Sequence, residues 1–232
     1  MRLRPVLHAL FPPTCMLCGA PGVGDLDLCA GCAAELPWNR HACARCALPL
    51  DGTGYPGLLC GSCQRRAPRY DRCIAALRYA TPVPALVGAA KFRGRLNAAR
   101  LLGQVLAEAV RGAGEPLPEV LVPVPLHRAR LAERGYNQAL EIARVLGRVL
   151  ALPMDDGCCE RILATLPQAG LDEAKRRHNI RGAFRARSPL GWRHLAIVDD
   201  VVTTGSTVEE LARVLRRAGA ERIAVWAVAR TP

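Results

Sequence analysis

Two adjacent acids and a run of small hydroxyl residues follow one apolar segment, and these residues are the part of the chain best suited to chemistry. Residues 195–207 read Leu-Ala-Ile-Val-Asp-Asp-Val-Val-Thr-Thr-Gly-Ser-Thr, and a helical pattern follows from Val208 to Arg217. The continuous apolar run 195–198 predicts a strand buried on both faces of a parallel sheet. Ligands of open α/β sheets bind beyond the carboxyl ends of such strands. We therefore expect the acids and the hydroxyl turn to face a ligand.

The hydroxyl turn has the composition of a phosphate site. Its members are Thr203, Thr204, Gly205, Ser206 and Thr207. The hydroxyls and the free N–H groups of the following helix donate hydrogen bonds, and the helix dipole attracts an anion. Asp199 and Asp200 would repel a phosphate, so we expect them to face sugar hydroxyls or Mg²⁺. A phosphate, a vicinal diol and a metal describe a phosphorylated ribose, whereas the alternative is an ordinary strand-to-helix turn with a Ser/Thr cap.

This segment resembles the binding motif for 5-phosphoribosyl-1-pyrophosphate (PRPP) in type I phosphoribosyltransferases. In that motif, four apolar residues and two acids precede a Thr-Thr-Gly-x-Thr-like loop. The resemblance implies that Asp199 and Asp200 hold the ribose hydroxyls with Mg²⁺, and that residues 203–207 bind the 5′-phosphate.

Eight of the eleven cysteines form four C-x-x-C pairs between residues 15 and 63. The pairs are Cys15/Cys18, Cys29/Cys32, Cys43/Cys46 and Cys60/Cys63. Each pair supplies two thiolates about 4 Å apart, and two pairs complete a tetrahedral zinc site. The short gaps favour sequential pairing, with interleaved pairing as the alternative. We expect two structural Zn²⁺ ions, because a complete Cys₄ shell leaves no open coordination position.

The length of 232 residues, half of them apolar, suits one α/β domain and a small module. We assign residues 1–67 to a double zinc-ribbon domain stabilised by its metal ions, and residues 68–232 to the α/β domain, with a hinge at 68–79. The formal charge of +12 falls to roughly +8 when two Zn(Cys)₄ centres are counted. Because Lys91 and Lys175 are the only lysines, this charge is mostly arginine, which suits phosphate contacts. Codon bias in a GC-rich genome is the alternative explanation.

Apolar patterns elsewhere predict the elements that surround this site. Strands are expected at 74–79, 120–124, 161–165, 183–185 and 223–229, and helices over 83–109, as one or two helices, and over 138–150. Arg128 and Arg134 lie in an expected loop after strand 120–124, where a pyrophosphate leaving group would need cationic partners. Lys91 lies three residues before Gly94, a pattern that indicates either phosphate contact, which would place Lys91 on the same pyrophosphate side, or a solvated turn.

A polar segment at 166–178 is long enough to close over a charged ligand. Its candidate contacts, with the residue that follows it, are Gln168, Arg176, Arg177 and Asn179. A plain solvated loop is the alternative.

Taken together, the motifs resemble those of the ComF family, which includes competence proteins. The family pattern combines a double zinc ribbon, a Lys-aromatic-x-Gly segment (91–94), a Val-Pro-Val-Pro-Leu-His run (122–138), Gln168-x-x-Leu171, and the PRPP motif. The resemblance covers almost the entire chain and implies a type I phosphoribosyltransferase fold, an open, mostly parallel sheet with flanking helices. It also implies PRPP with Mg²⁺ as ligand, handling of single-stranded DNA in natural competence, and a competence helicase-like protein and other DNA-uptake proteins as partners.

Three functions remain open at this point. The first is a phosphoribosyltransferase, in which a nucleophile displaces pyrophosphate from C1 of PRPP. A glutamine-dependent amidophosphoribosyltransferase is not expected, because that reaction uses a separate domain with an N-terminal cysteine, and this chain begins Met-Arg-Leu. The second is a DNA- or protein-binding module with a PRPP-sensing or vestigial site. Its aromatic content of 4% disfavours base stacking and favours phosphate contacts. The third is a zinc-ribbon scaffold for protein partners.

The N-terminal residues carry no secretory pattern, because prolines interrupt the apolar residues of segment 1–13. No apolar stretch approaches the length of a membrane span, so no membrane insertion is expected. We expect a cytoplasmic protein, placed at the inner face of the membrane only through partners.

Overall fold

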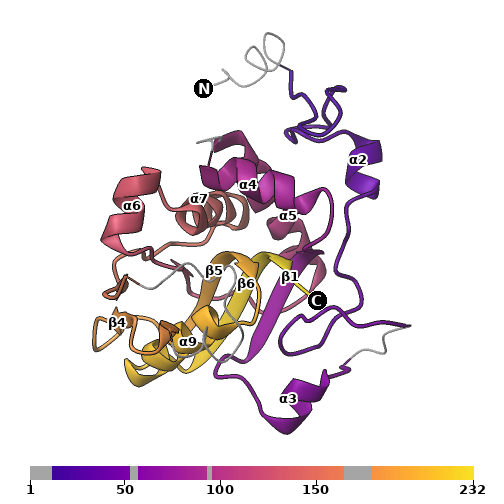
Figure 1. Cartoon of the computed structure of the whole chain (residues 1–232). Coiled ribbons are helices and arrows are strands. Elements are labelled where there is room, and N and C mark those ends of the chain that lie inside the picture. Colours follow the sequence, from indigo (N-terminus) through magenta and orange to yellow (C-terminus); the bar gives the residue numbers. More distant parts are fainter. Residues whose placement is uncertain (1–11, 53–56, 93–95, 165–178) are drawn as a thin grey trace.

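A four-stranded parallel sheet with the strand order β1-β6-β5-β2 forms the centre of the molecule (Figure 1). The computed structural model describes residues 12–52, 57–92, 96–164 and 179–232. The strands are β1 (Arg72–Arg78), β2 (Val120–Pro123), β5 (His194–Val202) and β6 (Arg222–Arg230). β5 and β6 lie in the middle of the sheet, and residues 195–198 of β5 are fully buried, as their continuous apolar run predicts. The strand continues through both acids to Val202.

Helices cover both faces of this sheet (Figure 1). Three helices, α4 (Val83–Phe92), α5 (Leu96–Gly112) and α7 (Gln138–Leu150), pack on one face, where Val198 and Trp226 are buried. Helix α9 (Ser206–Arg217) packs on the opposite face, against Ile197 and Val225. The fold is therefore the open α/β arrangement that the sequence predicts. None of the helices in the described ranges is long and apolar enough to cross a membrane.

Three smaller features differ from expectation. The strand expected at 161–165 is instead β3 (Cys159–Arg161), which pairs antiparallel with β4 (Phe184–Ala186) outside the main sheet. The expected basic loop contains helix α6 (Arg128–Arg134), because His127 caps its first turn and Gly135, at φ +78°, ends it. The segment 68–79, expected as a hinge, is part of the sheet, because the strand also predicted there, at 74–79, is β1.

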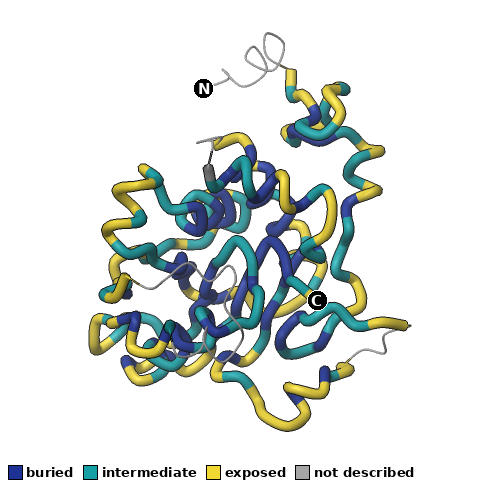
Figure 2. Tube along the Cα trace, viewed as in Figure 1, coloured by how far each residue is buried: buried dark blue, intermediate teal, exposed yellow. Residues whose placement is uncertain are grey.

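The two zinc ribbons pack on different parts of the α/β domain. The first, which contains α2 (Ala30–Ala34), shares a buried cluster with α4 and α5, and its Asp27 pairs with Arg100 of α5. The second, which contains α3 (Gly61–Arg65), shares a buried cluster with the opposite face of the sheet. Figure 2 shows that buried residues concentrate in the sheet and in the helices that face it.

Main-chain hydrogen bonds join the ribbons to the outer edge of β1. The amide of Asn39 donates to the carbonyl of Ala76 (2.9 Å), and the amide of Cys73 donates to the carbonyl of Arg45 (2.8 Å). An uncovered edge strand is a site of unwanted pairing. Residues 37–45 cover that edge, so the ribbons are built into the fold of the α/β domain.

The contact between α5 and α7 depends on Gly103. A Cβ atom at this position would lie 2.7 Å from Cβ of Val145 and 3.3 Å from the carbonyl oxygen of Ile142. We expect Gly103→Ala to lower the free energy of unfolding by about 1–3 kcal/mol, because the helices must separate. Gly88→Ala in α4 is the matched control: a Cβ there meets nothing within 4 Å, so the helix should gain up to about 1 kcal/mol. Urea unfolding measures both, and equal effects would contradict the packing described.

Candidate functional site

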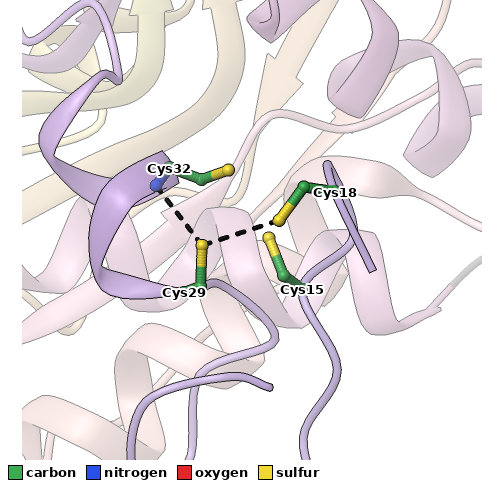
Figure 3. A group of neighbouring side chains, drawn as sticks. All are labelled: Cys15, Cys18, Cys29 and Cys32. Atoms are coloured by element: carbon green, nitrogen blue, oxygen red, sulfur yellow. Dashed lines mark hydrogen bonds between the residues drawn. The ribbon is translucent and has the colours of Figure 1, made fainter. Parts of the chain in front are cut away.

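Two Cys₄ centres form from sequential cysteine pairs, which confirms the predicted pairing. They are Cys15, Cys18, Cys29 and Cys32 in the first ribbon, and Cys43, Cys46, Cys60 and Cys63 in the second. Within each centre the ligand atoms all lie within 4.8 Å of one another. Figure 3 shows the thiols of the first centre converging from the loop around Cys15 and from the start of α2. The Sγ atoms of Cys18 and Cys29 are 3.6 Å apart, as are those of Cys46 and Cys60.

This geometry fits a tetrahedral zinc ion. Four sulfur ligands at the usual Zn–S length stand about 3.8 Å apart. Main-chain N–H groups also point at the sulfurs: Cys60 N lies 3.3 Å from Cys43 Sγ. Although burial opposes ionisation, such N–H groups lower the pKa of Cys15 to about 6 and that of Cys43 to about 7. Each centre thus holds a thiol ready to bind metal near neutral pH, and the two centres support two structural zinc ions.

The hydroxyl turn lies between β5 and α9, as predicted. Gly205 is the N-cap of α9 at φ +79°, a backbone conformation that glycine adopts readily, and it offers no side-chain cap to the helix N–H groups. The Oγ atoms of Thr204 and Ser206 are 2.9 Å apart. Hydroxyls and helix N–H groups therefore surround one small space, which Asp199 also lines. This arrangement suits a phosphate group next to a sugar.

The two acids form a compact charged pair with Lys91. The Nζ atom of Lys91 lies 2.8 Å from Oδ2 of Asp200, and Oδ1 of Asp199 accepts the amide of Asp200 (2.9 Å). Burial and the charge of Asp200 raise the pKa of Asp199 well above its usual range. Burial alone would lower the pKa of Lys91, but the charges of Asp200 and Asp199 outweigh it and raise that pKa. Lys91 thus forms an ion pair with Asp200 next to Asp199. A cation or a diol that binds Asp200 must compete with the ammonium group of Lys91.

Removing the charge of Lys91 should destabilise the protein in a pH-dependent way. We expect Lys91→Gln to lower the free energy of unfolding by about 2 kcal/mol at about pH 8, because two carboxylates then share a buried site without their cation. The loss should shrink as the pH falls to about 5, because Asp199, whose pKa is already raised and which Lys91 no longer stabilises as a carboxylate, takes up a proton. Lys91→Arg retains the charge and is the control. Denaturant unfolding at both pH values measures the effect, and a loss independent of pH would contradict it.

Basic side chains lie beyond the carboxyl end of β2, next to the acids. Pro123 at the end of β2 pairs with Val198, so the following segment starts beside Asp199. Arg128 and Arg134 are the first and last residues of α6 in that segment. Burial and the charge of Arg130 lower the pKa of Arg161, while the charge of Asp199 opposes this effect. Two like-charged guanidinium groups therefore lie within electrostatic reach of one another and of the acid.

Arg130 lies in the basic segment that the sequence places on this side, whereas Arg161 was not among the sequence candidates. Arg161 follows no motif, and only the tertiary fold brings β3 toward α6. Asn137 has a supporting role: its side chain donates to the carbonyl of Val124 (3.0 Å) and caps α7 by accepting the amide of Ala139 (3.0 Å). Of the segment expected to close over a ligand, Gln168, Arg176 and Arg177 lie outside the described residues. Asn179 is described and half-buried at its end.

A cleft of about 1280 Å³ adjoins the hydroxyl turn on its other side. It runs between the second zinc ribbon and α9, and we call it the arginine cleft. The basic residues that line it are Arg65, Arg66, Arg69, Arg181, Arg213, Arg217 and Arg230. Its acids are Glu209 and Glu210, and Glu210 is held by Arg213 (2.6 Å). The cleft therefore carries a net positive charge. Its arginines come from distant parts of the chain, so the sequence alone does not predict that they lie together.

Comparisons with known proteins agree with these features. A family model described as a double zinc ribbon domain matches residues 6–64. The DNA utilization protein YhgH of Escherichia coli (strain K12) is 36% identical over 225 residues, which cover 95% of this chain and 98% of that protein. Competence protein F of Haemophilus influenzae is 34% identical over 224 residues, covering 93% of this chain and 96% of that protein. The chain belongs to the ComF family.

Membership of the ComF family confirms the resemblance found in the motifs, including the double zinc ribbon ahead of the α/β domain. Among solved structures, the glutamine PRPP amidotransferase of B. subtilis, in a complex with ADP and GMP, matches 61% of this chain and 30% of that chain. Its sequence identity is 19% and its TM-score is 0.41. A similarity this weak gives no information about the substrate of this ComF protein.

Proposed function

We propose that this ComF protein binds PRPP together with Mg²⁺ and acts as a phosphoribosyltransferase-like protein in the use of incoming DNA. The observation that carries the proposal is the junction of β5 and α9, where Asp199 and the hydroxyl turn line one small space and Asp200 follows Asp199 on the strand. The 5′-phosphate would accept hydrogen bonds from residues 203–207. The carboxylates of Asp199 and Asp200 would accept hydrogen bonds from the ribose hydroxyls, and their oxygens are ligands that Mg²⁺ prefers.

The pyrophosphate would extend toward α6. Arg128 and Arg134 are the candidates from the sequence, and the charges of Arg130 and Arg161 support the same direction. When the ligand arrives, the ammonium group of Lys91 would move from Asp200 to the pyrophosphate, and the Asp200 carboxylate would then be free to bind the metal. Bound Mg²⁺ would neutralise charge on the pyrophosphate. The protein's part in a transfer reaction is then positioning and charge stabilisation, without a side-chain nucleophile.

Turnover is tested by pyrophosphate release. Purified protein with PRPP and Mg²⁺ is offered nucleobases, amines and single-stranded DNA as acceptors in turn. Release that depends on one acceptor and is absent in Asp199→Asn/Asp200→Asn would support a transferase. Binding without release for every acceptor would favour a PRPP sensor.

The arginine cleft favours a contact with single-stranded DNA as a second activity. Arg65 and Arg66 are exposed at the end of α3 and line the cleft beside the second ribbon. Phosphate contacts make binding steeply salt-dependent, with a slope of about 0.7 in log K per contact on single strands. Partners from DNA uptake and a cytoplasmic location belong to the same proposal.

Fluorescence anisotropy against salt tests this contact. Arg65→Gln/Arg66→Gln should reduce the salt slope by about 1.4, whereas Arg144→Gln/Arg148→Gln on α7 removes the same charge elsewhere and should leave the slope unchanged. DNA binding that is insensitive to salt would rule the cleft out.

A further inference from the structure

Arg230 is a buried cation that connects two parts of the molecule. It is the last residue of β6 and only 7% of its surface is exposed. Its Nε donates to the carbonyl of Cys46 (3.3 Å), a ligand of the second zinc centre. Its Nη1 donates to the carbonyls of Val202 (3.2 Å) and Thr203, where the hydroxyl turn begins. One guanidinium group thus joins the zinc ribbon to the proposed phosphate site.

Within the described residues, the hydrogen-bond partners of Arg230 carry no negative charge. The acceptors are main-chain carbonyls, among them that of Thr231 (2.9 Å), together with the Thr231 hydroxyl. All of these groups are neutral, and a buried charge without a counter-charge is costly. Two anions would flank it in the loaded protein. Four thiolates and one Zn²⁺ give the second centre a net charge of −2, and a phosphate would lie in the turn at residues 203–207.

We propose that Arg230 is a positioning residue that couples the second zinc centre to the phosphate site. Zinc fixes the knuckle that contains Cys46, and the Cys46 carbonyl in turn orients the guanidinium that holds the carbonyls of Val202 and Thr203. Loss of this zinc therefore loosens the turn and weakens phosphate binding. For PRPP as the ligand, the inference rests on the proposed function. The ribbon of the first zinc centre pairs with α5 through Asp27 and Arg100, on the face of the sheet opposite α9. The first zinc centre therefore serves as the internal control.

The test compares Cys63→Ser with Cys32→Ser, each of which removes the last ligand of one centre. At a temperature where both are folded by circular dichroism, Cys63→Ser should weaken PRPP binding about tenfold and accelerate amide hydrogen exchange at residues 203–207. Cys32→Ser should change the PRPP affinity by less than about twofold and leave that exchange rate unchanged. Unchanged affinity and exchange in Cys63→Ser would overturn the coupling.

Arg230→Gln tests the connection itself with both cysteine centres intact. It should retain two zinc ions per chain, weaken PRPP binding and accelerate exchange at residues 203–207. Adding Cys63→Ser to Arg230→Gln should produce little further loss, because both changes break the same connection. Additive losses would contradict the proposal, as would normal exchange at residues 203–207 in Arg230→Gln.

Two further outcomes keep the test decisive. If Cys63→Ser does not fold, the reciprocal effect replaces it: PRPP should slow the removal of the second zinc by a chelator in the wild type, but not in Arg230→Gln. Equal protection in both proteins would overturn the coupling. If the wild type fails to bind PRPP, the proposed function fails, and the exchange rates of residues 203–207 still decide the coupling.

Discussion

Replacing Cys43 by serine is expected to lower the Tm of the whole protein by on the order of 10 °C, because roughly 2–4 °C follow each kcal/mol in a chain of this size. Cys43 is 2% exposed and lies in the same buried cluster as Tyr70 and Cys73. A structural zinc ion contributes several kcal/mol of folding free energy. Its loss would leave buried thiols without their metal, beside the edge strand that the ribbons cover.

Cys18→Ser is the matched control for this prediction. Cys18 is an exposed thiol of the first ribbon, which packs beside α4 and α5. Its loss should loosen that ribbon and lower the Tm by less than Cys43→Ser does, because the second zinc centre and the hydrogen bonds of residues 37–45 to β1 remain. Differential scanning calorimetry, with zinc content measured on each variant, tests both. Equal losses of Tm would show that the second ribbon is no more tightly integrated than the first.

Asp199→Asn is expected to unfold at a higher temperature than the wild type at neutral pH, by about 2 °C or more, while losing its ligand. Burial and the charge of Asp200 raise the pKa of Asp199, so the ionised carboxylate is less stable in the folded chain than in the unfolded chain. The amide removes that charge, and its Oδ1 still accepts the amide of Asp200. An acid retained at a cost to stability is typical of a binding site.

The difference in stability between Asp199→Asn and the wild type should depend on pH. The advantage of Asp199→Asn should be greatest above the raised pKa of Asp199. It should disappear as the pH falls through that pKa toward the ordinary aspartate value of about 3.9, where both states of the wild type become protonated. Asp156→Asn, at an exposed aspartate, should leave the Tm unchanged at every pH. A variant at Asp199 that is less stable than the wild type at neutral pH would show that its carboxylate is a structural group.

The elements with strong local patterns could be predicted from the sequence. Helix α7 has the predicted boundaries, and β5 with α9 was found because an apolar run, two acids and a glycine follow one another without interruption. The zinc pairing followed from the short gaps between C-x-x-C pairs. These features depend on neighbours in the chain.

Features that depend on distant contacts could not be predicted. Strand β3 has three residues, and its position is set by pairing with β4 beyond a long connection. Helix α6 was missed because its cap is a histidine, which is not a common capping residue. Arg230 stands near the end of the chain without a motif, and only the parallel register that places it opposite Val202 brings it to the site. The packing of each ribbon on a different face likewise has no local signal.

The central claim is that the junction of β5 and α9 binds PRPP, and calorimetric titration tests it most directly. PRPP with Mg²⁺ is titrated into the zinc-loaded wild type and into Asp199→Asn/Asp200→Asn, which retains the shape of the site but lacks both charges. We expect heat of binding from the wild type and a loss of affinity of about 100-fold or more in the variant. The absence of binding by the folded, zinc-loaded wild type, or equal binding by both proteins, would contradict the claim.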